Sequence, residues 1–319
     1  MKGLTATLLE RKVKSTSIHR LNADRKLSRF QQIFWFLYNW LNNITPNFYR
    51  HYFKTYHFRA DILETDWCKL GTKTSPSRRL SNLFWLRLPW EAIQSELGTI
   101  NVVDTGCGSG NYGAKLRAYS GDRIASYTGL DAFSHDNWIS QTNENPTFKF
   151  HRSDSTKIFN WVSREDNFFI SQSAIEHFED DVVYFEQLRD HICRSRKPTI
   201  QIHLFPSSAC LKLYSLHGIR QYTPRTISII AAIFDKFSYS VLYSLGGREC
   251  NLVHWEFITK PLYIFRTGDF RETKTDEYDQ RLRNAIRADM STPCKSPSFY
   301  ALVIHSHAIR TLFTDTWTI

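Results

Sequence analysis

Residues 100–113 read INVVDTGCGSGNYG, and this stretch decides the fold. Ile100, Val102 and Val103 predict the end of a short buried strand, which Asp104 follows directly. Four glycines come next, at positions 106, 108, 110 and 113, and the helix-like run AKLRAY follows them. Because glycine has no Cβ, such a loop can adopt positive φ angles and bring its N–H groups close to a ligand. The stretch therefore predicts a strand, a ligand-binding loop and a helix in succession.

Two kinds of nucleotide-binding protein use this device. Residues 108–113 alone match the dinucleotide fingerprint G-x-G-x-x-G. The longer string, which begins at Asp104, resembles motif I of the class I S-adenosylmethionine (SAM) methyltransferases, whose loop cradles the methionine part of the cofactor. An acid suits an amino group and a sulfonium better than a doubly anionic pyrophosphate. The resemblance implies a cofactor site formed by Asp104, Gly106, Cys107, Gly108 and Gly110. A tight turn without a ligand is the remaining alternative.

The positive charge of the chain is concentrated near its amino-terminal end. Lys and Arg number 41 against 31 Asp and Glu, for a net charge of +10. Residues 1–60 hold eleven of the basic residues and only two acids, Glu10 and Asp24. With 42% hydrophobic residues, the 319-residue chain is expected to be globular, as one domain with additions or as two domains.

The six cysteines show neither a C-x-x-C pair nor the His/Cys spacing of a metal site. This pattern favours a reducing compartment and argues against a disulfide framework. We therefore expect no metal and a cytoplasmic location. No secretory signal is visible, and no apolar run approaches the ~20 residues that span a bilayer.

Residues 30–44, FQQIFWFLYNWLNNI, predict a helix that is apolar on nearly all sides. Such a helix is either buried or lies in an interface. Flanking basic residues and the Trp and Tyr side chains favour peripheral contact with an anionic membrane. A lid helix packed on a catalytic domain explains the pattern as well. Nucleic acid is less favoured, because no recognised binding motif is present.

From residue 98 onward, strand-like and helix-like segments alternate, as in a parallel sheet covered on both faces. Strands are predicted at residues 100–104, 125–131, 147–152, 167–174, 198–206, 238–246 and 298–307. This predicts an α/β, Rossmann-like fold: a seven-stranded, mostly parallel sheet in a three-layer sandwich. By resemblance to the methyltransferases, the seventh strand should be antiparallel.

Two domains are expected from this layout. Residues 1–95 would form a basic, aromatic-rich helical extension or lid. Residues 96–319 would form the methyltransferase domain, with a cofactor half at 96–206 and a substrate-contacting half at 207–319.

Further cofactor contacts are expected at the tips of the following strands. Asp131 falls 18 residues after Gly113, where a carboxylate can accept both ribose hydroxyls of a nucleoside. Asp154 resembles in position the acid that meets the adenine amino group in methyltransferases, although a helix N-cap explains it equally well. Ser171 near the tip of the fourth strand is also expected beside the cofactor.

The Glu176-His177 pair after the fourth strand also resembles the family, because many small-molecule and sugar O-methyltransferases carry such a pair there. A hydroxyl acceptor must lose its proton, and histidine is the side chain best suited to take it. We therefore predict His177 as the general base, oriented by Glu176. The alternative is that His177 is merely polar surface at a helix start. Substrate contacts are predicted for His203, His217, Arg220 and Tyr222, a group suited to an anionic sugar. A position within the sheet, with its polar atoms satisfied, explains His203 equally well.

The sequence thus predicts a SAM-dependent methyltransferase that acts on a hydroxyl of a small molecule, a sugar or a lipid-linked polysaccharide precursor. Ser171-Gln172-Ser173-Ala174 stands where amino-methylating nucleic-acid enzymes of this fold have N-P-P-Y, which favours oxygen over nitrogen. Two rivals remain. One is an NAD-type oxidoreductase that uses the same glycines, and the other is a non-catalytic scaffold subunit of the same fold.

Overall fold

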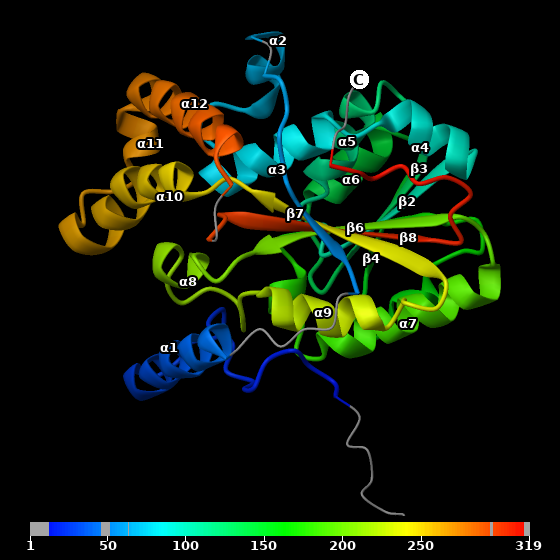
Figure 1. Cartoon of the computed structure of the whole chain (residues 1–319), viewed down its shortest axis with the longest axis horizontal. Helices are drawn as coiled ribbons and strands as arrows, with labels where there is room; N and C mark the ends of the chain where they lie inside the picture. The colour runs from blue at the N-terminus through cyan, green and yellow to red at the C-terminus, as the bar shows by residue number, and fades with distance from the viewer. Residues whose placement is uncertain (1–12, 46–51, 63, 294–295, 316–319) are drawn as a thin grey trace, which may run out of the picture.

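The computed structural model describes residues 13–45, 52–62, 64–293 and 296–315, and an eight-stranded sheet forms its middle layer (Figure 1). Residues 1–12 and 46–51 of the basic extension, and Cys294, lie outside the described residues. The strand order is β1-β7-β8-β6-β5-β2-β3-β4. The bounds are β1 (Lys54–His57), β2 (Ile100–Thr105), β3 (Ile124–Asp131), β4 (Phe148–Arg152), β5 (Phe168–Gln172), β6 (Thr199–Pro206), β7 (Ser238–Leu245) and β8 (Phe299–Ser306).

All neighbouring strands are parallel except β8, which runs antiparallel between β6 and β7. Apart from β1, this is the predicted sheet, including its antiparallel last strand, and the expected fold class is confirmed. After β2 the chain adds β3 and β4 on one side, and β5 and β6 lie on the other. The order therefore reverses between β2 and β5, and ligands of open α/β sheets bind in the crevice at such a point.

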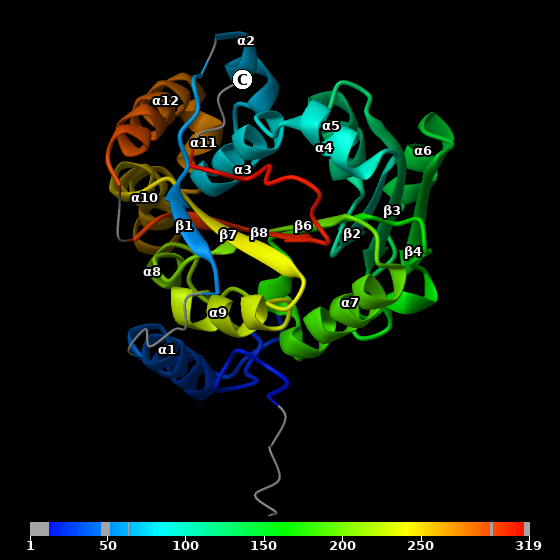
Figure 2. The same cartoon turned by 45° about the vertical axis from the view of Figure 1, so that its right-hand side comes forward.

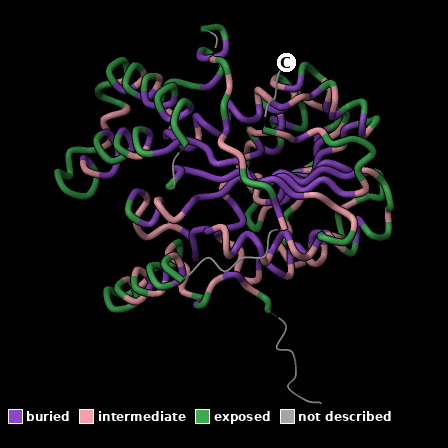
Figure 3. Tube along the Cα trace, in the orientation of Figure 1, coloured by how far each residue is buried: buried purple, intermediate pink, exposed green. Residues whose placement is uncertain are grey.

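Successive side chains of each strand pack into two separate hydrophobic cores, because side chains alternate between the two faces of a sheet. Val102 and Ile170 belong to one core, and Val103 and Phe169 belong to the other. Figure 2 shows the two layers of helices that cover these faces. On the first lie α3 (Pro76–Leu86), α4 (Trp90–Leu97), α5 (Asn111–Tyr119), α10 (Arg248–His254) and α12 (Thr275–Ser291), and on the second α7 (Asp181–Ser195) and α9 (Pro224–Ala232). In Figure 3 the strands between them are almost wholly buried.

Several helices begin where their sequences supply a cap. Ser28 and Gln31 form a capping box at the start of α1 (Arg29–Ile44), because each side chain bonds the other's backbone N–H. Ser75 caps α3, and Pro76 occupies the first turn, where a missing N–H costs nothing. Pro89 separates α3 from α4.

Some elements were not predicted. The four-residue β1 pairs with β7, and α6 (Asn137–Glu144) lies beside β4. The start of α3 falls in a stretch that resembles a linker in composition. The shorter elements are α2 (Glu64–Trp67), η1 (Cys68–Leu70), η2 (Ile158–Asn160), η3 (Ile175–His177), α8 (Cys210–Leu213), η4 (Trp255–Thr259), η5 (Pro261–Phe265) and α11 (Phe270–Thr273).

Helix α1 packs beneath the second layer, against the loop that precedes α9 (Figure 1). Trp35 is fully buried, and its indole N–H donates to the carbonyl of Gly218 at 3.0 Å. Asn39 donates to the carbonyl of Ile219 at 3.1 Å. The inner face of α1 is thus fixed to the loop around Gly218. Within the described part of the chain, no helix has the length and apolar character needed to cross a bilayer.

Candidate functional site

The glycine loop lies at the switch point of the sheet and depends on glycine at two positions. Gly106 has φ +80°, and a Cβ there would lie 2.3 Å from the Cβ of Ala174. Gly110 has φ +79°, and a Cβ there would lie 2.5 Å from the Phe150 ring. By contrast, a Cβ on Gly108 would meet nothing within 4 Å. The loop is thus pressed against the strands at both ends and open in the middle.

Asp131, at the end of β3, holds this loop from the side. Its Oδ2 accepts the N–H of Gly108 at 2.9 Å, and its Oδ1 accepts the N–H of Phe133 at 3.0 Å. Each carboxylate oxygen has a second lone pair, so both can still accept from a ligand. Trp138 on α6 donates to the carbonyl of Gly108 at 2.8 Å and stacks on Phe150. These contacts fix the side of the loop where a nucleoside would lie.

A cavity of about 400 Å³ opens beside the loop. Its lining combines the loop with residues that sequence reasoning missed. The missed residues are Arg78, Ser109, Asn111, Tyr112, Lys115, Gln172 and Ser173. Two of these, Arg78 on α3 and Lys115 on α5, are cationic, and Asp104 supplies an anionic group in the same cavity. The cavity therefore offers both charges that a zwitterionic amino acid requires.

Asp104 is almost fully buried, and its Oδ2 accepts the hydroxyl of Tyr127 at 2.6 Å. Burial, together with the nearby Asp131 charge, raises the pKa of Asp104 to about 7, against the opposing hydrogen bond from Tyr127. Burial also raises the pKa of the Cys107 thiol far above its usual value. Cys107 is therefore a thiol at neutral pH.

Ser171, His203 and Asp154 lie away from this cavity lining. Ser171 and His203 are both fully buried, and Ser171 Oγ lies 2.8 Å from His203 Nδ1 between neighbouring strands. Burial lowers the pKa of His203 to about 3. Asp154 accepts the N–H and the hydroxyl of Thr156 in a local turn, whereas the N-cap position of the following η2 is Lys157, so Asp154 is not a helix N-cap. Cofactor contacts of Ser171 and Asp154 and a substrate contact of His203 stay predictions.

Glu176, His177 and His217 come together at the same edge of the sheet. Nε2 of His177 and Nε2 of His217 each lie 3.9 Å from Oε1 of Glu176. The two imidazole rings meet edge to face, with centroids 4.7 Å apart. Nδ1 of His177 is hydrogen-bonded to the carboxylate of Asp24. Burial alone would lower the pKa of His177, but Asp24 and Glu176 outweigh it and raise the pKa.

Arg220 fastens the segment that carries this cluster. Its guanidinium is 1% exposed and donates to the carbonyls of Ile175, Phe178 and Glu179. It also lies 3.3 Å from Asp181, whose carboxylate accepts the buried hydroxyl of Tyr222 at 2.9 Å. The contacts of Arg220 and Tyr222 are thus internal to the protein. A substrate-binding role for Arg220 or Tyr222 stays a prediction.

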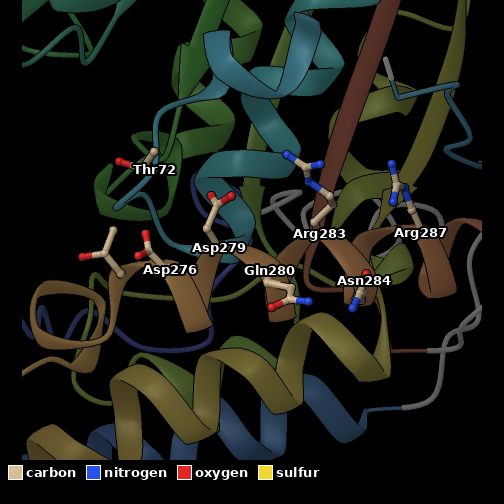
Figure 4. Close-up of a pocket in the computed structure, with 8 residues that line it drawn as sticks. Thr72, Asp276, Asp279, Gln280, Arg283, Asn284 and Arg287 are labelled. Atoms are coloured by element: carbon tan, nitrogen blue, oxygen red, sulfur yellow. The ribbon is translucent and has the colours of Figure 1, made fainter. Parts of the chain in front are cut away.

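A second hollow lies between α12 and the loop around Thr72 (Figure 4). Three of its four charged side chains are paired: Arg283 and Arg287 contact Glu64 at 2.6 Å and 3.6 Å, and Asp279 contacts Arg79 at 3.0 Å. It contains neither a glycine loop nor a histidine among its lining residues. The cavity at the switch point is therefore the stronger candidate for the functional site.

No protein-family model matches the sequence, and no curated protein matches it. Solved structures of methyltransferases are similar in fold. One is the plantazolicin methyltransferase BamL, with 12% identity over 76% of this chain and 86% of that one, at a TM-score of 0.40. Another is a SAM-dependent methyltransferase from Archaeoglobus fulgidus, with 15% identity over 74% of this chain and 96% of that one, at a TM-score of 0.43. A third is a putative sarcosine dimethylglycine methyltransferase from Galdieria sulphuraria, with 12% identity over 72% of this chain and 85% of that one, at a TM-score of 0.43.

Proposed function

We propose that the protein is a SAM-dependent methyltransferase. The observation that carries this proposal is that Asp104, Arg78 and Lys115 together line the cavity beside the glycine loop. A carboxylate can hold the amino group of the methionine part of SAM, and the two cations suit its carboxylate. The antiparallel β8 between β6 and β7 supports the same choice over a dinucleotide dehydrogenase.

The residues around the cavity fit this cofactor. Gly108 leaves the middle of the loop open to close approach, because no atom lies within 4 Å of the place of its Cβ. Asp131 retains one acceptor site on each carboxylate oxygen for the two ribose hydroxyls. Asp104, Arg78 and Lys115 would then orient the amino-acid end. When bound, SAM supplies an electrophilic methyl group on a sulfonium.

We also propose that the acceptor is a hydroxyl group and that His177 takes its proton. Asp24 holds Nδ1 of His177, which leaves Nε2 as the basic nitrogen. Gly106, in contact with Ala174, brings the cofactor loop against the segment that leads into Glu176 and His177. Methyl transfer is mostly positioning, so a base placed at the same edge of the sheet is well suited to assist it.

A lipid-linked sugar or polysaccharide precursor is the acceptor class that the surface favours. An apolar groove of about 600 Å³ runs between α1 and the π-helical segment 255–265. It is lined by Phe36, Leu37, Trp40, Leu211, Lys212, Ser215, Trp255, Thr259, Tyr263 and Ile264. Ser215 lies two residues before His217, so the groove reaches the loop that carries this histidine. An acyl or polyprenyl chain in the groove would place its head group near the candidate site.

Calorimetric titration with SAM, S-adenosylhomocysteine and NAD tests the cofactor assignment. We expect both adenosyl ligands to bind with micromolar affinity and NAD to show no binding. Asp104→Asn should lower the affinity for S-adenosylhomocysteine by at least about tenfold, because the substitution removes a charge-assisted hydrogen bond. Asp276→Asn, in the hollow by Thr72, is the matched control and should leave the affinity unchanged. Binding of NAD alone would overturn the proposal in favour of the oxidoreductase.

A further inference from the structure

The carboxylate of Glu176 is buried between two imidazoles without a hydrogen bond. Its side chain is 1% exposed, and neither carboxylate oxygen has a hydrogen-bond partner among the described residues. The Nη1 and Nη2 donors of the nearby Arg220 go to backbone carbonyls, Ser15 and Asp181, and its buried Nε has no hydrogen-bond partner among the described residues. A buried carboxylate without hydrogen bonds is strongly destabilising, and a cation between the three side chains would offset this penalty.

Asp24 determines which nitrogen of His177 faces Glu176. Its Oδ2 is hydrogen-bonded to Nδ1 of His177, and its Oδ1 accepts the N–H of Gly218 at 3.2 Å. Because an ionised carboxylate only accepts hydrogen bonds, Nδ1 carries the proton, and Nε2 is the nitrogen that faces Glu176 and can bind a cation once it is deprotonated. Metal-binding histidines are held by a carboxylate in this same way.

We propose that Glu176, His177 and His217 form a binding site for one divalent transition-metal ion. One ligand atom from each residue lies within 4.8 Å of the others, and both Glu–His distances are 3.9 Å. Atoms bound to one ion at ~2.1 Å lie at most ~4.2 Å apart, so a small rotation of an imidazole completes the geometry. Two nitrogens and one carboxylate oxygen favour Zn²⁺, Mn²⁺ or Fe²⁺ over Ca²⁺ and Mg²⁺.

The site is accessible from solvent, as a catalytic metal requires. The side chains of His177 and His217 are 28% and 41% exposed, although Glu176 is buried. Three protein ligands leave coordination positions open for water or an acceptor hydroxyl. An ion here would lower the pKa of that hydroxyl, and His177 would then be a ligand instead of the base. This catalytic consequence rests on the proposed methyltransferase function, whereas metal binding itself does not.

Titration of the metal-stripped full chain with Co²⁺, followed by visible absorption, tests the site. We expect one Co²⁺ per chain with the ligand-field bands of a nitrogen- and oxygen-bound ion. His217→Ala should weaken the affinity by at least about 100-fold. Asp24→Asn should weaken it by about 10–100-fold and retain the bands, because Asp24 positions His177 without touching the ion. His151→Ala, whose imidazole stacks on Trp161 elsewhere, is the control and should change nothing.

Each variant is also titrated with S-adenosylhomocysteine, which reports whether it is folded. Loss of Co²⁺ binding in a His217→Ala protein that retains S-adenosylhomocysteine binding is the expected result. A wild-type protein that binds S-adenosylhomocysteine but no Co²⁺ would overturn the metal site, since protonated imidazoles would then balance Glu176. Stoichiometric Co²⁺ binding unaffected by His217→Ala would also overturn it. Co²⁺ binding without any adenosyl ligand would instead refute the methyltransferase proposal and leave the metal site standing.

Discussion

Asp104 combines burial with a place in the cavity lining, and these two properties make its charge depend on pH. Its pKa is raised to about 7, so in the free protein the carboxyl group is largely neutral below this value. A ligand with a positive amino group binds the ionised form better. Binding should therefore release a proton from Asp104 when the solution is more acidic than pH 7.

We predict that the affinity for S-adenosylhomocysteine falls by about tenfold per pH unit below pH 7 and levels off above pH 8. Calorimetry at pH 5.5 to 8.5 measures this dependence. Asp104→Asn should bind more weakly and with almost no dependence on pH. An equally steep dependence in Asp104→Asn would assign the titration to another group.

His203 should make the stability of the fold depend on pH. Its folded pKa of about 3 is below the usual 6.5, so the unfolded chain binds a proton that the folded chain excludes. The contribution of His203 to the free energy of unfolding is complete above pH 6.5. It is lost as the pH falls toward 3, at about 1.4 kcal/mol per pH unit.

Denaturant unfolding of the wild type and of His203→Gln between pH 7 and 4 measures this contribution. The stability difference between the two proteins should shrink as the pH falls. Ser171→Ala, which removes the partner of His203 without removing the titrating group, should lower stability by a similar amount at every pH. If the stability loss in His203→Gln were as independent of pH as the loss in Ser171→Ala, the depressed pKa of His203 would be refuted.

The sequence predicted the site only where neighbouring residues form a motif. Asp104, the glycines and Asp131 are recognisable because a strand, a loop and the next strand tip follow each other closely. Arg78 and Lys115 lie on helices without any such pattern, so the cations of the cavity were missed. The meeting of Glu176 with His217 depends on how the loop around Gly218 folds back, which no spacing rule reveals.

At the scale of an element, Gly106 of the glycine loop and Gly98 at the end of α4 offer a pair for a test. Both have positive φ, +80° and +73°, but only a Cβ at Gly106 would meet another atom, 2.3 Å away. Gly98→Ala should cost about 1–3 kcal/mol of stability from backbone strain. Gly106→Ala should cost at least ~2 kcal/mol more, because its Cβ also displaces Ala174.

Thermal unfolding and S-adenosylhomocysteine titration of the two variants separate these effects. Gly106→Ala should bind the ligand at least tenfold more weakly, whereas Gly98→Ala should bind it normally. Equal losses of stability in the two variants would contradict the close approach of the loop to Ala174.

The predicted strands could be recognised because each shows either alternating apolar and polar residues or an unbroken apolar run over five or more positions. β1 has four residues and an exposed, polar start, so its pairing with β7 could not be foreseen. α6, with the sequence NWISQTNE, has few apolar residues and was missed for the same reason. Long periodic segments determine the fold class, and short ones depend on tertiary contacts.

At the scale of the whole molecule, one apolar surface is exposed on α1 and the segment 255–265. Phe30, Ile33 and Ile44 on α1 are each more than half exposed, as are Tyr263 and Ile264. Contiguous apolar patches of this kind mark sites of contact with a protein, a ligand or a membrane. With basic residues such as Arg25, Lys26 and Arg29 beside α1, an anionic bilayer suits this surface.

We predict that the protein sediments with anionic phospholipid vesicles at low salt and is released at high salt. Replacing Ile33 and Leu37 by Glu should abolish sedimentation, because both side chains are exposed on α1. Ile139→Glu is the control, since Ile139 is similarly exposed on α6, away from this surface. Equal loss in the control, or no binding by the wild type, would refute the membrane contact.

The proposed function depends on which ligand the cavity beside the glycine loop holds. A crystal structure of the protein with S-adenosylhomocysteine measures this most directly. We expect the amino group of the ligand at Asp104, its carboxylate at Arg78 or Lys115 and its ribose hydroxyls at Asp131. Ligand density elsewhere, or a ligand turned so that its ribose lies at Asp104, would contradict it.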